Sequence, residues 1–128
     1  MIYGIGADLV NIKRIEEALL RFGDRFLHRI LNEEEVAACA QSSQPARFLA
    51  KRFAAKEAFS KAFGTGIGED VGWHDVSVSH DTFGKPLIAP SPPLLAKMHL
   101  RQITHTHISI TDETEQALAF VVLEKSRL

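Results

Sequence analysis

The amino-acid sequence predicts an α+β fold in a single domain spanning residues 1–128. A chain of 128 residues is ordinarily one domain and is long enough to bury a core of its own. Stretches with helical and with strand periodicity follow one another without the regular alternation of a parallel α/β protein. Residues 117–123 form an almost continuous apolar run, which predicts a strand at the centre of the sheet.

The first predicted strand covers residues 1–10. Side chains alternate along a strand, so one side carries Gly4, Gly6 and Asp8 and the other carries Tyr3, Ile5, Ala7 and Leu9. We expect the apolar side to face the core. The glycine side lacks side chains, so another group can come close to the strand beside its carboxylate.

Three helices are predicted to follow this strand. Asn11 is a suitable cap for the first, which ends near Gly23. Asn32 followed by Glu35 is typical of the capping box that begins the third. The residues expected to face inward on the first two helices are Ile12, Ile15, Leu19 and Leu20, then Phe26, Leu27, Ile30 and Leu31.

A long helix is predicted to begin at Pro45 and to end at Gly64, because proline favours a first turn and glycine a helix end. A glycine-containing loop follows. The remaining patterns predict two strands around a turn at residues 83–87, a short helix over about 94–102 and a strand over 106–110.

Composition narrows the classes of function. An apolar content of 45%, a charged content of 24% and a net charge of −1 are those of an ordinary globular protein. The single cysteine, Cys39, rules out an internal disulfide and suits a reducing cytoplasm. We expect no secretory signal, no membrane span and no nucleic-acid partner, because the pI is near neutral and no apolar run is long enough.

Two separated carboxylates are the candidates for chemistry. Asp8 ends a glycine-rich strand, and Glu57 lies on the long helix between Lys56 and Lys61. Carboxylates beside glycines and lysines suit a hard metal ion that holds a phosphate. Two simpler interpretations stay open: Asp8 caps the next turn, and Glu57 forms an exposed ion pair with Lys61 one helical turn away.

Two other motifs give weaker evidence of function. Gly4-x-Gly6 lacks the third glycine of a dinucleotide-binding loop. His105-x-His107 lacks further zinc ligands nearby, although His107 could bond a phosphate.

The first half of the chain carries a small excess of positive charge. Five basic residues gather early, namely Lys13, Arg14, Arg21, Arg25 and Arg29, and they would suit an acidic partner. The alternative is a solvated helix face on which these residues are interspersed with acidic ones.

Taken together, the motifs resemble those of the 4′-phosphopantetheinyl transferases, in particular the small holo-acyl-carrier-protein synthases. Residues 4–8 match Gly-x-Gly-x-Asp and are followed by Arg-Ile at 14–15. Residues 53–62 match Phe-Ala-x-Lys-Glu-Ala-x-x-Lys-Ala. The turn at 83–86 and the strand at 107–110 also resemble the family, so the resemblance covers nearly the whole chain.

The resemblance implies an antiparallel sheet with the long helix packed on it, and an enzyme that moves the 4′-phosphopantetheine group of coenzyme A onto a serine of apo-acyl carrier protein in fatty acid biosynthesis. It implies that Asp8 and Glu57 hold Mg²⁺ and that Lys61 binds a phosphate oxygen. Apart from the resemblance, Lys56 and Lys61 bracket Glu57 with positive charge that could meet phosphates. The further residues expected to contact coenzyme A, the co-substrate, are Gly64, Gly66, Lys85, Pro86 and His107.

The resemblance also implies a homotrimer with coenzyme A between subunits. The acidic carrier protein would dock on Arg14, Arg21 and Arg25. Three matters stay open at this point: whether Glu57 is the general base, whether the chain is a non-catalytic coenzyme A or nucleotide-binding module, and whether it is a small metal-dependent hydrolase.

Overall fold

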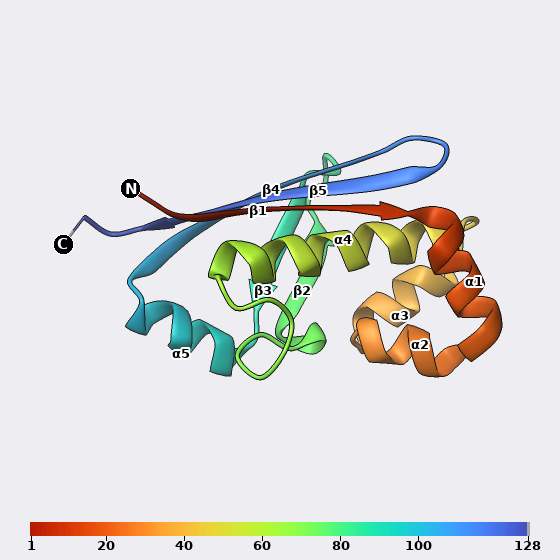
Figure 1. Ribbon diagram of the computed structural model, residues 1–128, viewed down its shortest axis with the longest axis horizontal. Helices are drawn as coiled ribbons and strands as arrows, with labels where there is room; N and C mark the ends of the chain where they lie inside the picture. The colour runs from red at the N-terminus through yellow and green to blue at the C-terminus, as the bar shows by residue number, and fades with distance from the viewer. Residues whose placement is uncertain (128) are drawn as a thin grey trace.

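The fold is α+β, as the sequence predicts. A computed structural model describes residues 1–127 of the chain (Figure 1). Its elements in chain order are β1 (Ile2–Asn11), α1 (Ile12–Phe22), α2 (Asp24–Ile30), α3 (Glu33–Ala40), α4 (Pro45–Phe63), a 3₁₀ turn η1 (Trp73–Asp75), β2 (Val76–His80), β3 (Pro86–Pro90), α5 (Pro92–Leu100), β4 (Ile103–Asp112) and β5 (Gln116–Lys125).

The main sheet is antiparallel and has the strand order β1-β5-β4, while β2 and β3 form a separate antiparallel hairpin. The predicted central position of β5 is therefore confirmed. Helix α4 runs along one face of the main sheet, with α1–α3 gathered near one end of it (Figure 1). Among residues 1–127, no helix combines the length and the apolarity needed to cross a membrane.

The contact between β1 and α4 depends on two glycines. A β-carbon built on Gly4 would lie 2.0 Å from the carbonyl oxygen of Ala62, and one built on Gly6 would lie 2.0 Å from that of Ala58. Such distances are far inside van der Waals contact, so the strand and helix backbones approach each other directly.

This contact reverses the expected orientation of β1. Its apolar side faces away from α4, with Ile5 58% and Leu9 59% exposed, so the prediction that this side forms the core is wrong. The apolar pattern of β1 does not show which side α4 covers, because the helix packs on the side of Gly4 and Gly6, which have no side chains.

The sheet consequently has an apolar outer face. In β5, Ala117, Ala119, Val121 and Leu123 are buried toward α4. Leu118 and Phe120 point the other way and are 37% and 42% exposed. They are paired in register with Leu9 and Ala7 of β1. We call the side chains of Ile5, Leu9, Leu118 and Phe120 the outer face.

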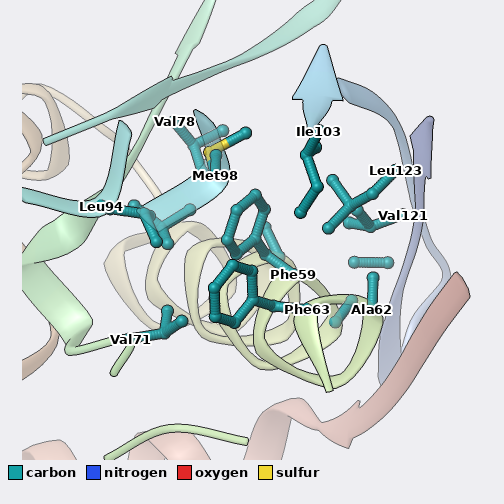
Figure 2. Packing of buried hydrophobic residues seen from close by; sticks show 14 of the residues in the cluster. Phe59, Ala62, Phe63, Val71, Val78, Leu94, Met98, Ile103, Val121 and Leu123 are labelled. Atoms are coloured by element: carbon teal, nitrogen blue, oxygen red, sulfur yellow. The ribbon is translucent and has the colours of Figure 1, made fainter. Parts of the chain in front are cut away.

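Two clusters of buried side chains make up the core. One surrounds Phe59 and Phe63, whose rings stack with centroids 6.4 Å apart, and includes Leu94 and Met98 of α5 (Figure 2). The other lies beneath α1–α3 and consists of Ile12, Ile15, Ile30, Leu31, Cys39, Leu49, Ala50 and Ala117.

Most helix ends lie where the local signals place them. The Asn11 side chain accepts from the Lys13 amide, and Asn32 and Glu35 form the predicted capping box. Gly64 ends α4 with φ 106°. Leu20 is an exception: it is 82% exposed rather than inward-facing. The helix before β4 also starts and ends slightly earlier than expected, at Pro92 and Leu100.

The glycine contact yields a stability prediction. Gly6→Ala should lower the free energy of unfolding by about 1–3 kcal/mol or more, because the added methyl group must push α4 away from β1. Urea unfolding at one fixed protein concentration measures the change. Gly68→Ala is the matched control, since nothing lies within 4 Å of its added β-carbon, and it should change stability by no more than about 0.5 kcal/mol. Equal effects of the two substitutions would contradict the close contact.

Candidate metal and phosphate site

A pocket of about 430 Å³ opens where β1, α1, α2 and α4 meet. Asp8 contributes from β1, and Glu57 and Lys61 contribute from α4. The structure thus brings together the three residues predicted to carry the chemistry. The rest of the lining is Leu9, Val10, Asn11, Arg14, Ile15, Ala18, Phe26 and Phe53.

Lys61 pairs with Asp8 rather than with Glu57. Its Nζ donates to Asp8 Oδ1 at 3.0 Å and to the carbonyl oxygen of Ala7 at 3.1 Å. The interpretation of Glu57 and Lys61 as an ion pair along the helix is therefore not what the described residues show. The Asp8 side chain is only 14% exposed, whereas that of Lys61 is 49% exposed and can reach a ligand.

Glu57 is half-buried and lies near a second negative charge. Burial raises the pKa of its carboxyl group, the charge of Asp8 raises it further, and Lys61 acts in the opposite direction. Ionised Glu57 is therefore under electrostatic strain that a cation between the two carboxylates would relieve.

The donor set fits Mg²⁺ better than a transition metal. Within residues 1–127, no group of three or more His, Cys, Asp or Glu side chains could hold a metal ion. Two carboxylates leave most coordination positions to water and phosphate oxygens, which is the usual way in which proteins hold Mg²⁺. A structural zinc site would need a fuller set of protein ligands.

Lys56 does not reach this pocket. It is fully buried, and its Nζ donates to the Ile30 carbonyl, to Glu35 and to the Trp73 carbonyl. The expectation that it meets phosphates is wrong, because all three of its protons already have acceptors inside the protein.

The glycine loop after α4 is held by the helix end. Gly64 and Gly66 have φ values of 106° and 70°. Their amides both donate to the carbonyl oxygen of Ser60, at 3.0 and 3.1 Å, and so cap the helix. They are not free to bind a nucleotide phosphate as expected. The absence of side chains still leaves open space at both glycines.

The residues predicted for the nucleotide end lie elsewhere on the chain. Lys85 stands at the exposed turn between β2 and β3, where Asp81 accepts from its amide, and Pro86 is the half-buried first residue of β3. His107 is exposed on β4 and bonds Glu124. None of the three lines the pocket of Asp8 and Glu57.

The three arginines predicted to dock a carrier are exposed. Arg14 and Arg21 are on α1, and Arg25 is on α2. Arg14 also lines the pocket, so the basic surface begins at the candidate site.

Sequence reasoning missed a second, basic pocket of about 340 Å³, which includes Arg47, Lys51, Arg52 and His80. Arg52 is only 5% exposed, and its Nε has no hydrogen-bond partner among the described residues. Burial and the positive charges of Arg52 and Lys51 lower the pKa of His80. The helical spacing of Arg47 and Lys51, four residues apart, was the available signal.

Comparison with known proteins places the chain in a family. The model of the 4′-phosphopantetheinyl transferase superfamily matches residues 4–121, and the chain belongs to this superfamily. It is 53% identical over 125 residues to the holo-[acyl-carrier-protein] synthase of Nitrosospira multiformis, covering 98% of this chain and 100% of that protein.

Solved structures of the same family match this fold. The crystal structure of the holo-[acyl-carrier-protein] synthase of Neisseria meningitidis matches with a TM-score of 0.94 and 46% identity, over 98% of this chain and 100% of that one. That of Helicobacter pylori, in complex with coenzyme A, matches with a TM-score of 0.83 and 36% identity, over 94% and 99%.

The raised pKa of Glu57 predicts an unusual effect on stability. At neutral pH and without metal, Glu57→Gln should melt at the same temperature as the wild type or higher, because a neutral side chain escapes the repulsion from Asp8. Any advantage should vanish as pH falls through the raised pKa, where wild-type Glu57 binds a proton in the folded state. Melting curves from pH 4 to 8 measure this. Glu17→Gln on the exposed side of α1 is the control, and a lower melting temperature for Glu57→Gln at neutral pH would contradict the argument.

Proposed function

We propose that this chain transfers the 4′-phosphopantetheine group of coenzyme A to a serine of apo-acyl carrier protein and releases adenosine 3′,5′-bisphosphate, in fatty acid biosynthesis in the cytoplasm. The observation that carries the proposal is the pocket shared by Asp8, Glu57 and Lys61 in a member of this superfamily. A relative that covers 98% of this chain is named for this activity, and one that covers 94% was solved with coenzyme A bound. The 128 residues are proposed to act as one catalytic domain.

In this proposal Asp8 and Glu57 hold Mg²⁺. When bound, the ion would neutralise charge on the pyrophosphate of coenzyme A while the bond to phosphorus breaks. Lys61 already bonds Asp8 and is half-exposed, so its ammonium group can also take a phosphate oxygen and help to align the group being transferred.

The serine hydroxyl must lose its proton as its oxygen attacks phosphorus. Glu57 is the candidate acceptor, directly or through one water, because Asp8 is engaged by Lys61 and the pKa of Glu57 is raised. A raised pKa makes a carboxylate a better base at neutral pH.

Two rival functions make different predictions. A non-catalytic module would bind coenzyme A or a nucleotide without needing both carboxylates, and a metal-dependent hydrolase would cleave coenzyme A without a carrier. Incubation with coenzyme A, Mg²⁺ and apo-acyl carrier protein separates the three, because only transfer makes the carrier heavier by one phosphopantetheine.

We infer that the working enzyme is a homotrimer with coenzyme A bound between subunits. The near-continuous apolar run of β5 predicts a strand covered on both faces, yet one face is exposed in the single chain. Lys85, Pro86 and His107 also lie outside the pocket that Asp8 and Glu57 share in one chain. A second copy on the outer face would cover it and could bring these groups, or the basic pocket, to the phosphates.

The transfer reaction gives the central prediction. Asp8→Asn and Glu57→Gln should each lower the rate of carrier modification by about 100-fold or more, since several kcal/mol of metal assistance is lost and each 1.36 kcal/mol is tenfold. Intact-mass measurement of the carrier over time reports the rate. Glu17→Gln is the control and should react as the wild type does. Near-normal transfer by either pocket variant in Mg²⁺ would contradict the proposed role of that carboxylate in holding the metal.

Carrier docking predicts a selective kinetic effect. Charge reversal at Arg14 or Arg21 should raise the KM for the carrier far more than the KM for coenzyme A, because the exposed arginines steer and orient an acidic partner. The wild-type KM for the carrier should rise with salt, since the Debye length falls from about 10 Å at 0.1 M to about 3 Å at 1 M. Charge reversal at exposed Arg127 is the control. If the KM for the carrier changed neither with salt nor with the reversals at Arg14 and Arg21, these arginines would be part of a solvated helix face and not of a docking surface.

Assembly can be tested at the outer face. Phe120→Asp should shift the sedimentation coefficient from that of a trimer to that of a smaller species, because a buried unpaired charge opposes association. Leu100→Asp, at an 86% exposed position on α5, should leave the trimer intact. A monomeric wild type at assay concentration would refute the trimer.

A further inference from the structure

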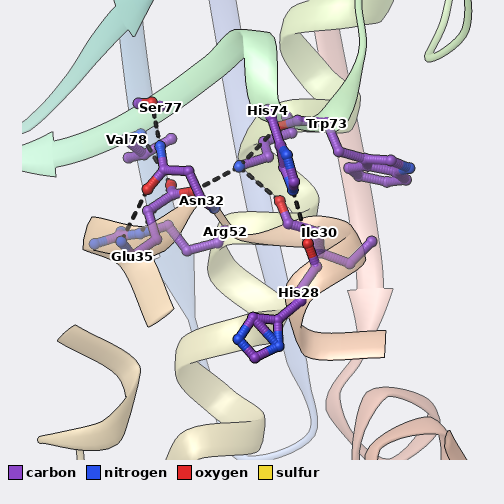
Figure 3. Close-up of polar contacts among 10 residues, drawn as sticks. His28, Ile30, Asn32, Glu35, Arg52, Trp73, His74, Ser77 and Val78 are labelled. Atoms are coloured by element: carbon purple, nitrogen blue, oxygen red, sulfur yellow. Dashed lines mark hydrogen bonds and ion pairs between the residues drawn. The ribbon is translucent and has the colours of Figure 1, made fainter. Parts of the chain in front are cut away.

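Among residues 1–127, Lys56 is the most deeply buried charged side chain, and it does not line the pocket of Asp8 and Glu57. Lys56 has no exposed surface, and its Nζ donates to Glu35 Oε1 at 2.6 Å, the Ile30 carbonyl at 2.7 Å and the Trp73 carbonyl at 2.8 Å. Figure 3 shows these acceptors turned toward one another from separate segments. One ammonium group thereby joins α4 to three other parts of the fold.

Of those parts, α2 supplies a lining residue of the candidate site, and η1 packs behind another. The Ile30 carbonyl ends α2, which carries Phe26 into the pocket. Trp73 lies in η1, and its ring is 5.0 Å from that of Phe53, another lining residue. Lys56 therefore fastens both the α2 wall and the support behind Phe53 to the helix that carries Glu57.

The third acceptor, Glu35, is also buried. It is 3% exposed and also accepts from the amides of Asn32 and Val78. Arg52 Nε lies 3.7 Å from its other oxygen. The carboxylate is thus fixed by α3 and β2 before Lys56 reaches it, which makes it a rigid anchor rather than a mobile surface partner.

The two carboxylates of the site do not depend on this linkage. Asp8 is placed against α4 by the glycine contact of β1, which meets the helix at Ala58 and Ala62. At 100° per residue, Lys56 lies on a different side of the helix from both alanines. Loss of Lys56 should therefore loosen the wall while the metal-binding pair keeps its spacing.

We propose that Lys56 is a positioning residue that sets the place of α2 and η1, and hence of the pocket wall and of the basic α1–α2 surface, relative to Glu57. The inference rests on the proposed function and assigns to Lys56 a part in the use of the carrier, not in metal binding.

The test compares Lys56→Met with the wild type and with Leu94→Ala, a buried substitution in the other core cluster. Lys56→Met removes the ammonium group that contacts buried Glu35 at 2.6 Å and leaves Arg52, at 3.7 Å, to offset the carboxylate charge. The double variant Glu35→Gln/Lys56→Met, in which that charge is also removed, is therefore the second test protein. Three quantities are measured: kcat/KM for the carrier, the Mg²⁺ concentration for half-maximal activation, and the fluorescence and acrylamide quenching of Trp73, the sole tryptophan.

In the Lys56 variants we expect kcat/KM for the carrier to fall about tenfold or more, because small misplacements of the reacting groups cost rate steeply. Trp73 emission should shift to longer wavelength and become easier to quench. The Mg²⁺ requirement should stay within about twofold, which a general loss of structure would not allow. Leu94→Ala should change none of the three.

Several results would overturn the inference: unchanged carrier use, an equal shift in the Mg²⁺ requirement, an unmoved Trp73 signal, or the same kinetic loss in Leu94→Ala. A wild-type chain that does not transfer would instead remove the proposed function, and the inference with it. If the wild type transfers and the Lys56 variants use the carrier equally well, the inference is overturned while the proposed function stands.

Discussion

The direct backbone contact between β1 and α4 is the constraint on which the site depends. With no side chain at Gly4 or Gly6, the strand lies against the carbonyl groups of Ala62 and Ala58. Asp8 comes two residues after Gly6, and Glu57 comes one residue before Ala58, so the close approach carries the two carboxylates to the same pocket. The site therefore depends on the missing side chains of Gly4 and Gly6 as well as on the carboxylates of Asp8 and Glu57.

Local signals predicted the helices well because each signal acts within a few residues. Pro45, Gly64 and the Asn32–Glu35 box fix helix ends by their own hydrogen bonds and dihedral angles. The orientation of β1 could not be read in this way. An apolar stripe indicates a covered face, but it does not say whether the cover is a helix of the same chain or another surface.

Lys56 shows a second limit of local reasoning. A lysine beside a glutamate on a helix has the appearance of a surface residue, since buried lysines are rare unless paired. Its burial requires acceptors from Ile30, Glu35 and Trp73, which are brought together only by the tertiary fold. Similarly, the motif predicted that Asp8, Glu57 and Lys61 lie together, whereas the position of Lys85 and His107 outside their pocket is set by the tertiary fold.

The bond from Lys61 to the Ala7 carbonyl has a consequence for aggregation. β1 is an edge strand, and the exposed edge of a sheet offers unpaired backbone groups to the edges of other molecules. The Lys61 ammonium group bonds the Ala7 carbonyl and the Asp8 carboxylate, and so places a positive charge beside this strand. Lysines on edge strands discourage edge-to-edge pairing. Lys61, for which we propose a phosphate contact, would thus also protect the strand from edge-to-edge pairing. Samples in which it is replaced should be checked for monodispersity by light scattering before a lower rate is ascribed to the reaction.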